Sequence, residues 1–586
     1  MTKRMLPIYI CLVCCGIAAT ASAQATAHRY RLTDLQQLWH QTRNAAGMTL
    51  DFHTTDSTQN RGVAYFDLQH TGGDYHRVQD GGMRNNLHFF TERYQKIGRY
   101  LYGYGAFDFN MGRTKQRAWS DVLRSYNSNP FISGGNVFGK YDHQDITLDA
   151  SLSTIQLGRF TYGANVRYEV GDLSRLRDPR SRINLLDYRF TPSVTYQIKG
   201  SRVQEVQGSR VQGSRVQGSR VQGSRVQGSR VQSSRVQGSR VQGSRVQGSR
   251  VQGSRVQGVQ EFNVQSIGLA LHYDRRKEKL PGLTTVQTDP NLQYYVMTGL
   301  ENATGTIGAY QGYMREYVNH ELGGELSYGA AVQNALFKFQ SVNALTLDHG
   351  TEYVYGTYKY EPGRYYTYRY GLSTQNRLRH GGLLHSLDVA VSYEQAYADE
   401  YRQERISETD GQTGYTSIRW NTTLQYRKRY QLKHLELNMH YRLTFTDGDS
   451  QRGYVGGRYQ LHDVSNKRLL PVSTFDYAAS DILAEGGITL LGHRLLADAQ
   501  AGYHIASKAD LALADATTDY AVGVLLPDRD ILNANYFQAR LQLEYQQPVS
   551  IKGRQTQWFV RCYGQHIGAQ HGLNRSTAGV SVGLYY

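Results

Sequence analysis

Apolar and polar residues alternate with a period of two along many segments of this chain. In Leu435–Thr446, every second residue from Leu435 to Phe445 is apolar, and the residues between them are Glu, Asn, His and Arg followed by Thr. Similar alternation runs through Phe160–Val170 and Phe537–Tyr545. This period places one set of side chains on each face of an extended strand, so the chain is expected to be all-β.

The C-terminus ends on a strand of the same kind. Ala578, Val580, Val582, Leu584 and Tyr586 fall on one face, and smaller or polar residues alternate with them. A chain that ends on an aromatic residue after this alternation resembles the Gram-negative bacterial outer-membrane β-barrel proteins, including uncharacterised barrels of about this size. The resemblance implies that Val580, Val582, Leu584 and Tyr586 form the signal read by the barrel-assembly machinery.

The first 23 residues are typical of a secretory signal peptide. Lys3 and Arg4 precede an apolar stretch, and Ala21-Ser22-Ala23 has the small residues of a cleavage site. A lipoprotein signal that uses Cys15 is the alternative. No later apolar run reaches the ~18 residues of a spanning helix, so export without a helical anchor is expected.

A soluble β-sandwich also contains strands with period two, but three features favour a membrane barrel. The polar faces carry charges, the apolar faces carry aromatic residues near strand ends, and the clear runs are about 9–13 residues long. Closure of the sheet would pair every backbone group where water is absent. We therefore predict a closed antiparallel transmembrane β-barrel over residues 60–586, with about 18 strands, give or take about two to four.

Connection lengths predict the direction of the strands. In such barrels the periplasmic turns are short and the outer loops are long. Short turns are predicted at Lys96–Gly98, Leu157-Gly158, Asp348–Gly350, Arg379–Gly382, Leu432–His434, Leu491–His493 and Ser550–Thr556. Long outer connections are predicted at Gln116–Gln144, Arg275–Asn334, Ala398–Gly414, Asp447–Ile482 and Ser507–Ile531. Glu301–Val332 and Arg452–Tyr477 leave room for extra strands, and Ala335–Leu347 alternates poorly.

Two segments stand outside the barrel pattern. Residues 24–59 form a periplasmic lead-in, in which Thr33-Asp34 could cap a short helix over Leu35–Ala45; a small plug inside the barrel is the alternative. The second segment is a tandem repeat of GSRVQ within residues 200–260. Its period of five forms no continuous apolar face, so we predict a disordered insert in a periplasmic turn, produced by expansion of a shorter connection. A stacked solenoid and a basic arm that touches an acidic partner or anionic lipid are the alternatives.

Charge and cysteine content exclude some classes. The formal net charge of +17 comes largely from the arginines of the repeat, and no nucleic-acid-binding motif is present. Cys562 is the one cysteine after the signal peptide, and it is expected to face lipid because it alternates with Trp558 and Val560.

No catalytic, cofactor-binding or metal motif is apparent, so neither an enzyme nor a cofactor is expected. The candidate lumen-lining residues are Arg167, Glu169, Arg419, Arg427, Glu436, Arg442, Arg540 and Glu544; pairing across strands is the alternative role for each.

The resemblance to outer-membrane barrels implies a passive or partner-assisted channel for an unknown solute. The alternatives are a surface-binding scaffold that uses long outer loops and a hydrolase with a Ser–His pair on adjacent strands. The expected partners are outer-membrane lipid, the barrel-assembly machinery and other envelope proteins.

Overall fold

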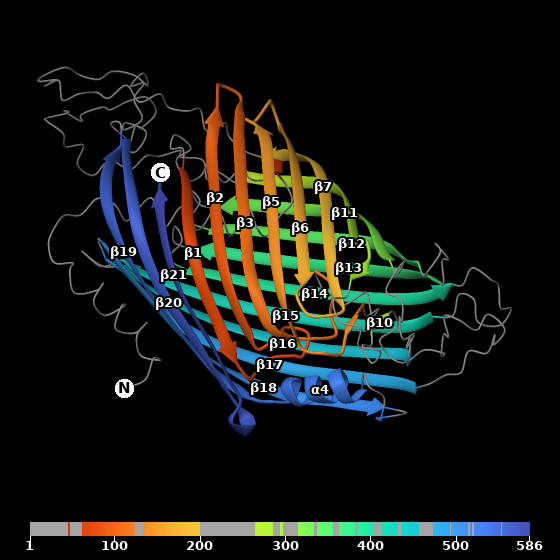
Figure 1. The fold of residues 1–586 in the computed structure, drawn as a ribbon. Coiled ribbons are helices and arrows are strands. Elements are labelled where there is room, and N and C mark those ends of the chain that lie inside the picture. The colour runs from red at the N-terminus through yellow and green to blue at the C-terminus, as the bar shows by residue number, and fades with distance from the viewer. Residues whose placement is uncertain are drawn as a thin grey trace, which may run out of the picture.

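The computed structural model describes residues 45–46, 61–123, 133–199, 264–284, 294–296, 314–332, 337–355, 363–380, 385–401, 413–431, 436–455, 473–492, 494–513, 516–517, 521–551 and 554–586. Within these residues, 18 antiparallel strands form one closed barrel (Figure 1). Their bounds are β1 Arg61–Gly73, β2 Met83–Ile97, β3 Leu101–Arg117, β5 Gly139–Thr154, β6 Phe160–Arg175, β7 Arg180–Lys199, β8 Val264–Leu280, β11 Met314–Val332, β12 Phe337–Tyr355, β13 Gly363–His380, β14 His385–Tyr401, β15 Thr413–Gln431, β16 Glu436–Val455, β17 Ser473–Leu491, β18 Leu495–Leu513, β19 Tyr536–Ile551, β20 Arg554–Ala569 and β21 Asn574–Tyr585.

A few short elements lie outside this ring. β9 (Leu283–Thr284) pairs with the start of β7, and β4 (Ser133–Gly135) pairs with β10 (Tyr294–Val296). The connection between β18 and β19 contains a π-helical turn and then α4 (Leu526–Leu532). In the described part of the chain, no helix is long and apolar enough to cross a membrane.

The first and last strands close the barrel. β21 lies antiparallel to β1, with a register that runs from Val63 opposite Tyr585 to Gly73 opposite Arg575. The backbone of Tyr586 continues the ladder, since Gly62 and Tyr586 exchange two N–H···O bonds of 2.6 and 3.0 Å. Closure leaves no unpaired sheet edge, which a barrel needs in hydrocarbon. The predicted fold class and strand number are confirmed.

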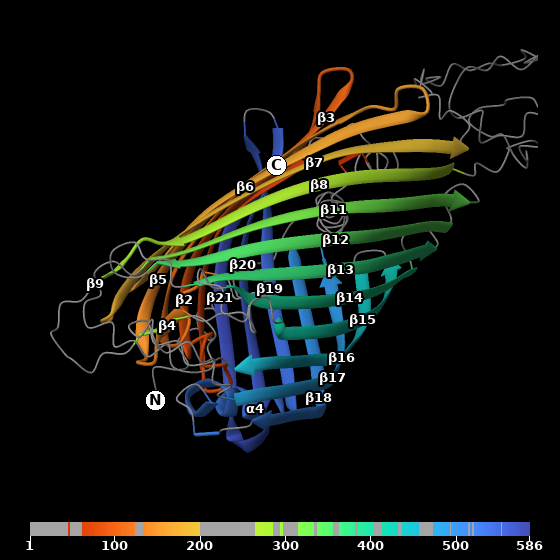
Figure 2. The same cartoon turned by 90° about the vertical axis from the view of Figure 1, so that its right-hand side faces the viewer.

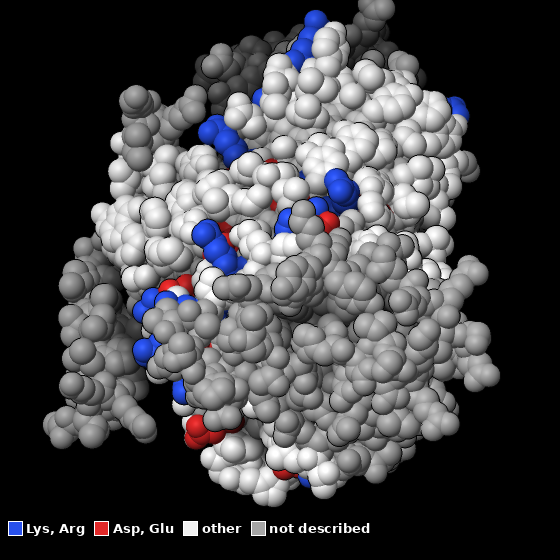
Figure 3. Space-filling view, turned by 45° about the vertical axis from the view of Figure 1, so that its right-hand side comes forward, with Lys and Arg blue, Asp and Glu red and all other residues white. Residues whose placement is uncertain are grey.

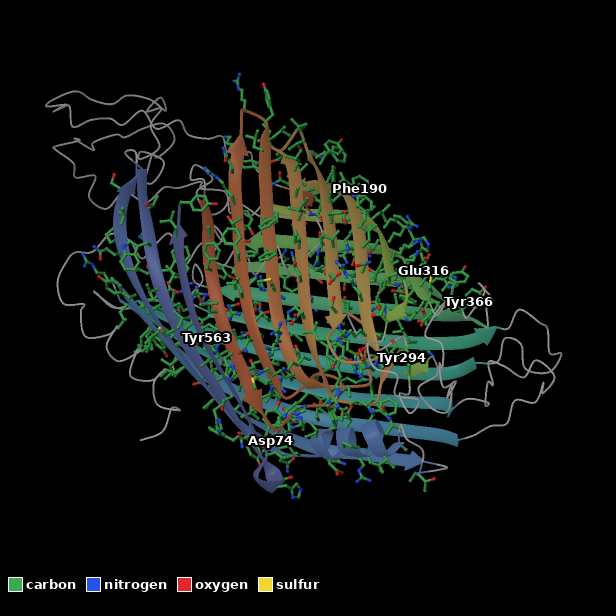
Figure 4. The ribbon with its side chains drawn as sticks, in the orientation of Figure 1. Asp74, Phe190, Tyr294, Glu316, Tyr366 and Tyr563 are labelled. Carbon is green, nitrogen blue, oxygen red and sulfur yellow. The ribbon has the colours of Figure 1, made fainter. Side chains whose placement is uncertain are left out.

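The outer wall is apolar. Leu271, Leu322 and Leu541 are 55%, 58% and 53% exposed, whereas polar neighbours on the opposite face, such as Asp274 and Glu321, are buried. Phe190 of β7, labelled in Figure 4, also belongs to this outer surface. Figure 2 shows the wall from β7 to β16 in front of β19–β21. Such an inside-out distribution is stable only when the wall contacts lipid, so the protein is located in the bacterial outer membrane.

The two ends of the barrel differ in the length of their connections. At the end that carries the C-terminus, residues 98–100, 155–159 and 552–553 join neighbouring strands. At the opposite end, connections as long as 118–138 and 281–313 occur. Short turns face the periplasm in barrels of this kind, so the C-terminal end is called the periplasmic end and the opposite end the outer end.

Two connection predictions are wrong. Asp348–Gly350, predicted to be a turn, lies inside β12, where Asp348 is opposite Glu321. Residues 275–334, predicted to be one outer loop, contain the end of β8 and all of β11. The outward positions of β11 include Glu316, His320 and Gly324, which weaken the alternation there. The poorly alternating Ala335–Leu347 also contributes its residues from Phe337 onward to β12.

Several predictions lie outside the described residues. They are the signal peptide at 1–23, the helix over Leu35–Ala45 except for Ala45 itself, and the conformation of the repeat within 200–260. The repeat connects two strands that pair with each other at the periplasmic end, since Lys199 of β7 is opposite Gln265 of β8.

Candidate functional site

The interior of the barrel is the candidate site, because the polar faces of the strands converge there. On the inner wall of β7, β8 and β11–β14, arginines bridge carboxylates of neighbouring strands. Arg369 contacts Glu321 at 2.7 Å, Asp348 at 3.0 Å and Glu394 at 3.7 Å. The other close pairs on this wall are Arg189–Asp274, Arg276–Asp187, His272–Glu321 and Arg315 with Glu278 and Glu352. Many interior charges are therefore neutralised by partners on adjacent strands.

An interior cavity of about 320 Å³ lies on the wall of β12–β16. Its polar lining includes Arg377, Asp388, Gln425 and Arg442. Arg377 donates to Asp388 at 2.7 Å, and Arg442 is half exposed. The cavity could hold a small polar molecule or a few water molecules. Arg442 is one of the predicted lumen-lining residues, and its exposed side chain lines this cavity.

The structure places the eight predicted lumen-lining residues on inner faces of the strands but does not bring them together. Arg167 contacts Glu169 at 3.3 Å, Glu436 contacts Arg429 at 3.1 Å, Arg442 lies 3.8 Å from Glu485, and Glu544 contacts Arg561 at 2.9 Å. Arg540 donates to Gln542 and is exposed. Arg419 and Arg427 are partly buried. A role in solute selectivity stays a prediction for all of them.

The four residues predicted as an assembly signal lie together at the barrel seam. Val580 and Val582 are 40% and 52% exposed on the outer wall. The ring of Tyr586 lies 5.4 Å from the guanidinium carbon of Arg93, and Tyr586 Oη is 3.2 Å from Thr91 Oγ1. Leu584 is opposite Ala64 of β1. Recognition of this strand by assembly machinery stays a prediction.

The lead-in places two described residues inside the barrel. Ala45 and Ala46 are completely buried, and the Ala46 N–H donates to Ser193 Oγ at 3.1 Å. A Cβ on Gly163 would clash with the backbone of Ala45 and Ala46, so glycine at this position lets the lead-in lie against β6. Ala45 packs in a cluster with the aromatic residues Tyr94, Tyr102, Tyr104 and Phe559 near the periplasmic end. Part of the chain's own N-terminal region thus occupies the periplasmic half of the lumen.

At the outer end, residues 118–123 after β3 turn back along the inner wall. The Tyr141 hydroxyl donates to the buried carboxylate of Asp121 at 2.7 Å. A Cβ on Gly171 of β6 would lie 3.1 Å from Leu123. Tyr294 of β10, labelled in Figure 4, is completely buried at the same end. These contacts narrow the outer mouth.

Three connections join to form what we call the outer cap, defined by Val78, Ala118, Trp119, Val524 and Asp528. The first four pack as one buried apolar cluster. The Asp528 carboxylate accepts the Val78 N–H at 3.0 Å and the Arg77 Nε–H at 3.3 Å. A Cβ on Gly523 would lie 2.9 Å from Nε1 of Trp119, so the helical segment can approach the indole only with glycine there.

Burial of Asp528 makes the cap contact electrostatically costly. Loss of solvation on burial raises the pKa of the Asp528 carboxyl above its ordinary value, while the Arg77 guanidinium and the Val78 N–H lower it. The hydrogen bonds that Asp528 accepts from Val78 and Arg77 therefore hold the cap in addition to apolar packing.

Neither a metal site nor a complete hydrolytic site is evident in the described residues. No group of three or more His, Cys, Asp or Glu side chains among them is arranged to hold a metal ion. One Ser–His contact does occur on adjacent strands, between His566 Nδ1 and Ser576 Oγ at 2.9 Å. Both residues are exposed on the outer wall, and no contact with a carboxylate orients this imidazole in the described structure, as a hydrolytic triad requires.

Sequence reasoning missed the charged wall of β8 and β11 and the outer cap. The inner face of β8 does alternate, with His272, Asp274, Arg276 and Glu278 at every second position, so that signal was present. The cap had no comparable signal, because Trp119 and Asp528 come from connections far apart in the sequence.

Among solved structures, the chain is similar at low identity to outer-membrane transporters and receptors. The copper transporter OprC resembles the chain at a TM-score of 0.39 and 9% identity, covering 90% of this chain and 80% of that one. The FrpB iron transporter from Neisseria meningitidis resembles the chain at a TM-score of 0.36 and 8% identity, covering 92% of this chain and 84% of that one. The alcaligin outer membrane receptor FauA from Bordetella pertussis resembles it at a TM-score of 0.35 and 8% identity, covering 90% of this chain and 76% of that one. No curated protein matches the sequence.

A family model shows the relationship directly. The model described as a family of unknown function (DUF6850) matches residues 45–208 and 254–586. The match spans the described part of the lead-in and all eighteen strands of the barrel. The chain is therefore an outer-membrane β-barrel that belongs to the family of unknown function DUF6850.

Proposed function

We propose that this barrel is a partner-assisted transport component, whose lumen passes an unidentified solute only after the chain's own inward-folded segments move. The observation that carries this proposal is that parts of the chain other than the barrel strands lie at both ends of the lumen. Ala45 and Ala46 lie inside the periplasmic half, and the outer cap joins three connections at the opposite end. In a permanently open pore, we would not expect chain segments to lie in the lumen at both ends.

The contacts at the two ends suit reversible closure. The described lead-in residues are held by one hydrogen bond to Ser193 and by contact with aromatic rings. The outer cap joins separate connections through a small apolar cluster and Asp528. Packing contacts of this kind can be lost locally while the hydrogen-bonded wall stays intact. A partner that pulls on the lead-in, or a solute that displaces the cap, would therefore change the lumen without unfolding the barrel.

Planar-bilayer conductance tests the proposal. We expect the mature chain to show no steady conductance. A combined variant that lacks residues 24–59 and carries Trp119→Ala and Asp528→Ala is expected to conduct steadily, because both obstructions are removed. The variant Trp420→Ala/Asp530→Ala is the matched control. It removes the same residue types from the outer wall and from an exposed helix position, and it should remain closed.

The same recordings separate the alternative functions. A mature chain that conducts as well as the combined variant would indicate a passive pore and contradict gating. A combined variant that is folded but non-conducting would contradict transport and favour the surface-binding scaffold. Folding of every variant is checked by its heat-modifiable mobility on a gel, so that loss of the barrel is not read as closure.

A further inference from the structure

A groove of about 1170 Å³ crosses the outer wall where β19–β21 meet β1–β3. Its aliphatic lining includes Leu68, Met111, Leu541 and Val580, which are 61%, 43%, 53% and 40% exposed. The small residues Gly564 and Ala578 form part of its floor. Because this wall faces hydrocarbon, the groove is filled by lipid chains rather than by water.

The end of the groove toward the outer membrane surface is charged, with Arg113, Asp142 and Asp172 in its lining and two lysines just beyond it. Arg113 lines the groove and binds both oxygens of Asp142, at 2.6 and 2.8 Å. Two residues further along β3, Lys115 lies directly opposite Lys140 of β5. Like charges directly opposite one another destabilise a sheet. Within the described part of the chain neither lysine forms an ion pair, and the nearby Asp142 is already bound by Arg113.

We propose that this groove is a binding site for a phosphorylated, multiply acylated lipid of the outer leaflet, with lipid A as the chemical type. A phosphate between the Lys115 and Lys140 ammonium groups would relieve their repulsion through charge-assisted hydrogen bonds. The acyl chains would lie along Leu68, Met111 and Leu541, in the half of the membrane nearest the outer surface. The site thus matches both parts of one amphiphile.

Two other occupants fit less well. Free inorganic phosphate would leave the apolar groove unused. A second copy of the barrel, related by a two-fold axis, would bring another Lys115 and Lys140 to the same interface and add to the repulsion. Cations are also present elsewhere on the surface: Figure 3 shows blue Lys and Arg side chains scattered over a largely white face. The groove differs from that face because a large aliphatic cavity lies beside two opposed lysines, each two residues beyond a residue of its lining.

Native mass spectrometry of the detergent-solubilised mature chain tests the site with lipid A that carries two phosphates. Lys115→Gln/Lys140→Gln is expected to weaken binding about thirtyfold, the effect of two surface cations on an anionic lipid. Arg99→Gln/Lys428→Gln removes two exposed cations at the periplasmic end and serves as the charge-matched control, with unchanged binding expected. Ala578→Phe fills the groove and is expected to reduce lipid A binding while the lysines remain.

The probes distinguish the sources of phosphate. Dephosphorylated lipid A and phosphatidylethanolamine should bind at least tenfold more weakly than the diphosphorylated lipid, and inorganic phosphate should not displace it. Equal binding by the lysine variant and its control would overturn the proposal, as would unchanged binding in Ala578→Phe. Displacement of lipid A by inorganic phosphate would show an anion site without a lipid role. A stable dimer that dissociates in Ala578→Phe would assign the groove to a second copy.

Discussion

Replacement of Arg315 by methionine is expected to lower the free energy of unfolding by about 3–5 kcal/mol. Arg315 binds Glu278 at 2.7 Å and Glu352 at 2.5 Å, and the side chains of all three are at most 1% exposed. Methionine has a similar length but no charge, so the substitution leaves two buried carboxylates without their cation. The buried charges, rather than lost packing, account for the size of the effect.

Chemical unfolding of the barrel in lipid vesicles measures this effect. Arg182→Met is the control, since Arg182 also binds an acid, Asp172 at 2.7 Å, but is 71% exposed; its cost should be below about 1 kcal/mol. The triple variant Arg315→Met/Glu278→Gln/Glu352→Gln should recover most of the loss, because it removes the stranded charges. Equal costs for Arg315→Met and Arg182→Met would contradict the burial of this triad.

Replacement of Leu271 by arginine is expected to destabilise the folded barrel in lipid by about 2–4 kcal/mol. Leu271 lies on the outer wall near the middle of β8, in an apolar run that ends at Tyr273 before Arg275. A guanidinium at this depth would have to leave water or deform the bilayer. The cost therefore depends on depth, not on the change of residue type alone.

The matched control is Val549→Arg on the outer wall of β19. Val549 is 38% exposed and lies two residues from the periplasmic end of its strand. There the new side chain can reach the headgroups, so the cost should fall to about 0–1 kcal/mol. Folding titrations of the two variants in the same vesicles give the comparison. Indistinguishable costs would show that the wall of β8 does not face the middle of a bilayer.

The architecture followed from the sequence wherever the outward residues were uniformly apolar. β16, β19 and β21 contain such runs, as in Leu435–Phe445, and closure of β21 on β1 places the C-terminal pattern at the seam. β11 was missed because Glu316 and His320 are on its outer face. Asp348-His349-Gly350 has the composition of a turn, but pairing with β11 and β13 holds it within a strand.

The site was less accessible to sequence reasoning. Alternation identifies which residues face inward, and it placed Arg442 and Glu544 there. It does not show that Arg315 of β11 reaches Glu278 on β8 and Glu352 on β12, because partner choice depends on register between strands. The sequence did not predict the groove either, since the two lysines beside it lie opposite one another only in the folded sheet. Long-range pairing, rather than local pattern, determines both features.

The repeat lies where the match to the family model is interrupted. The two segments matched by the family model leave residues 209–253 uncovered, and all of these belong to the GSRVQ tract. The strands on either side, β7 and β8, pair with each other along most of their length. The family model therefore covers the barrel strands on both sides without this part of the tract. Expansion within a shorter turn stays a prediction.

Fluorescence quenching of two native tryptophans tests the central claim most directly, namely that apolar residues face lipid while the chain's own segments close the lumen. Variants that keep either Trp420 or Trp119, with the other tryptophans replaced by phenylalanine, are folded into vesicles. Trp420, 48% exposed on the outer wall, should be quenched strongly by brominated lipid. Trp119, 4% exposed within the outer cap, should resist both brominated lipid and aqueous acrylamide. Free quenching of Trp119 by acrylamide, or protection of Trp420 from brominated lipid, would contradict the account.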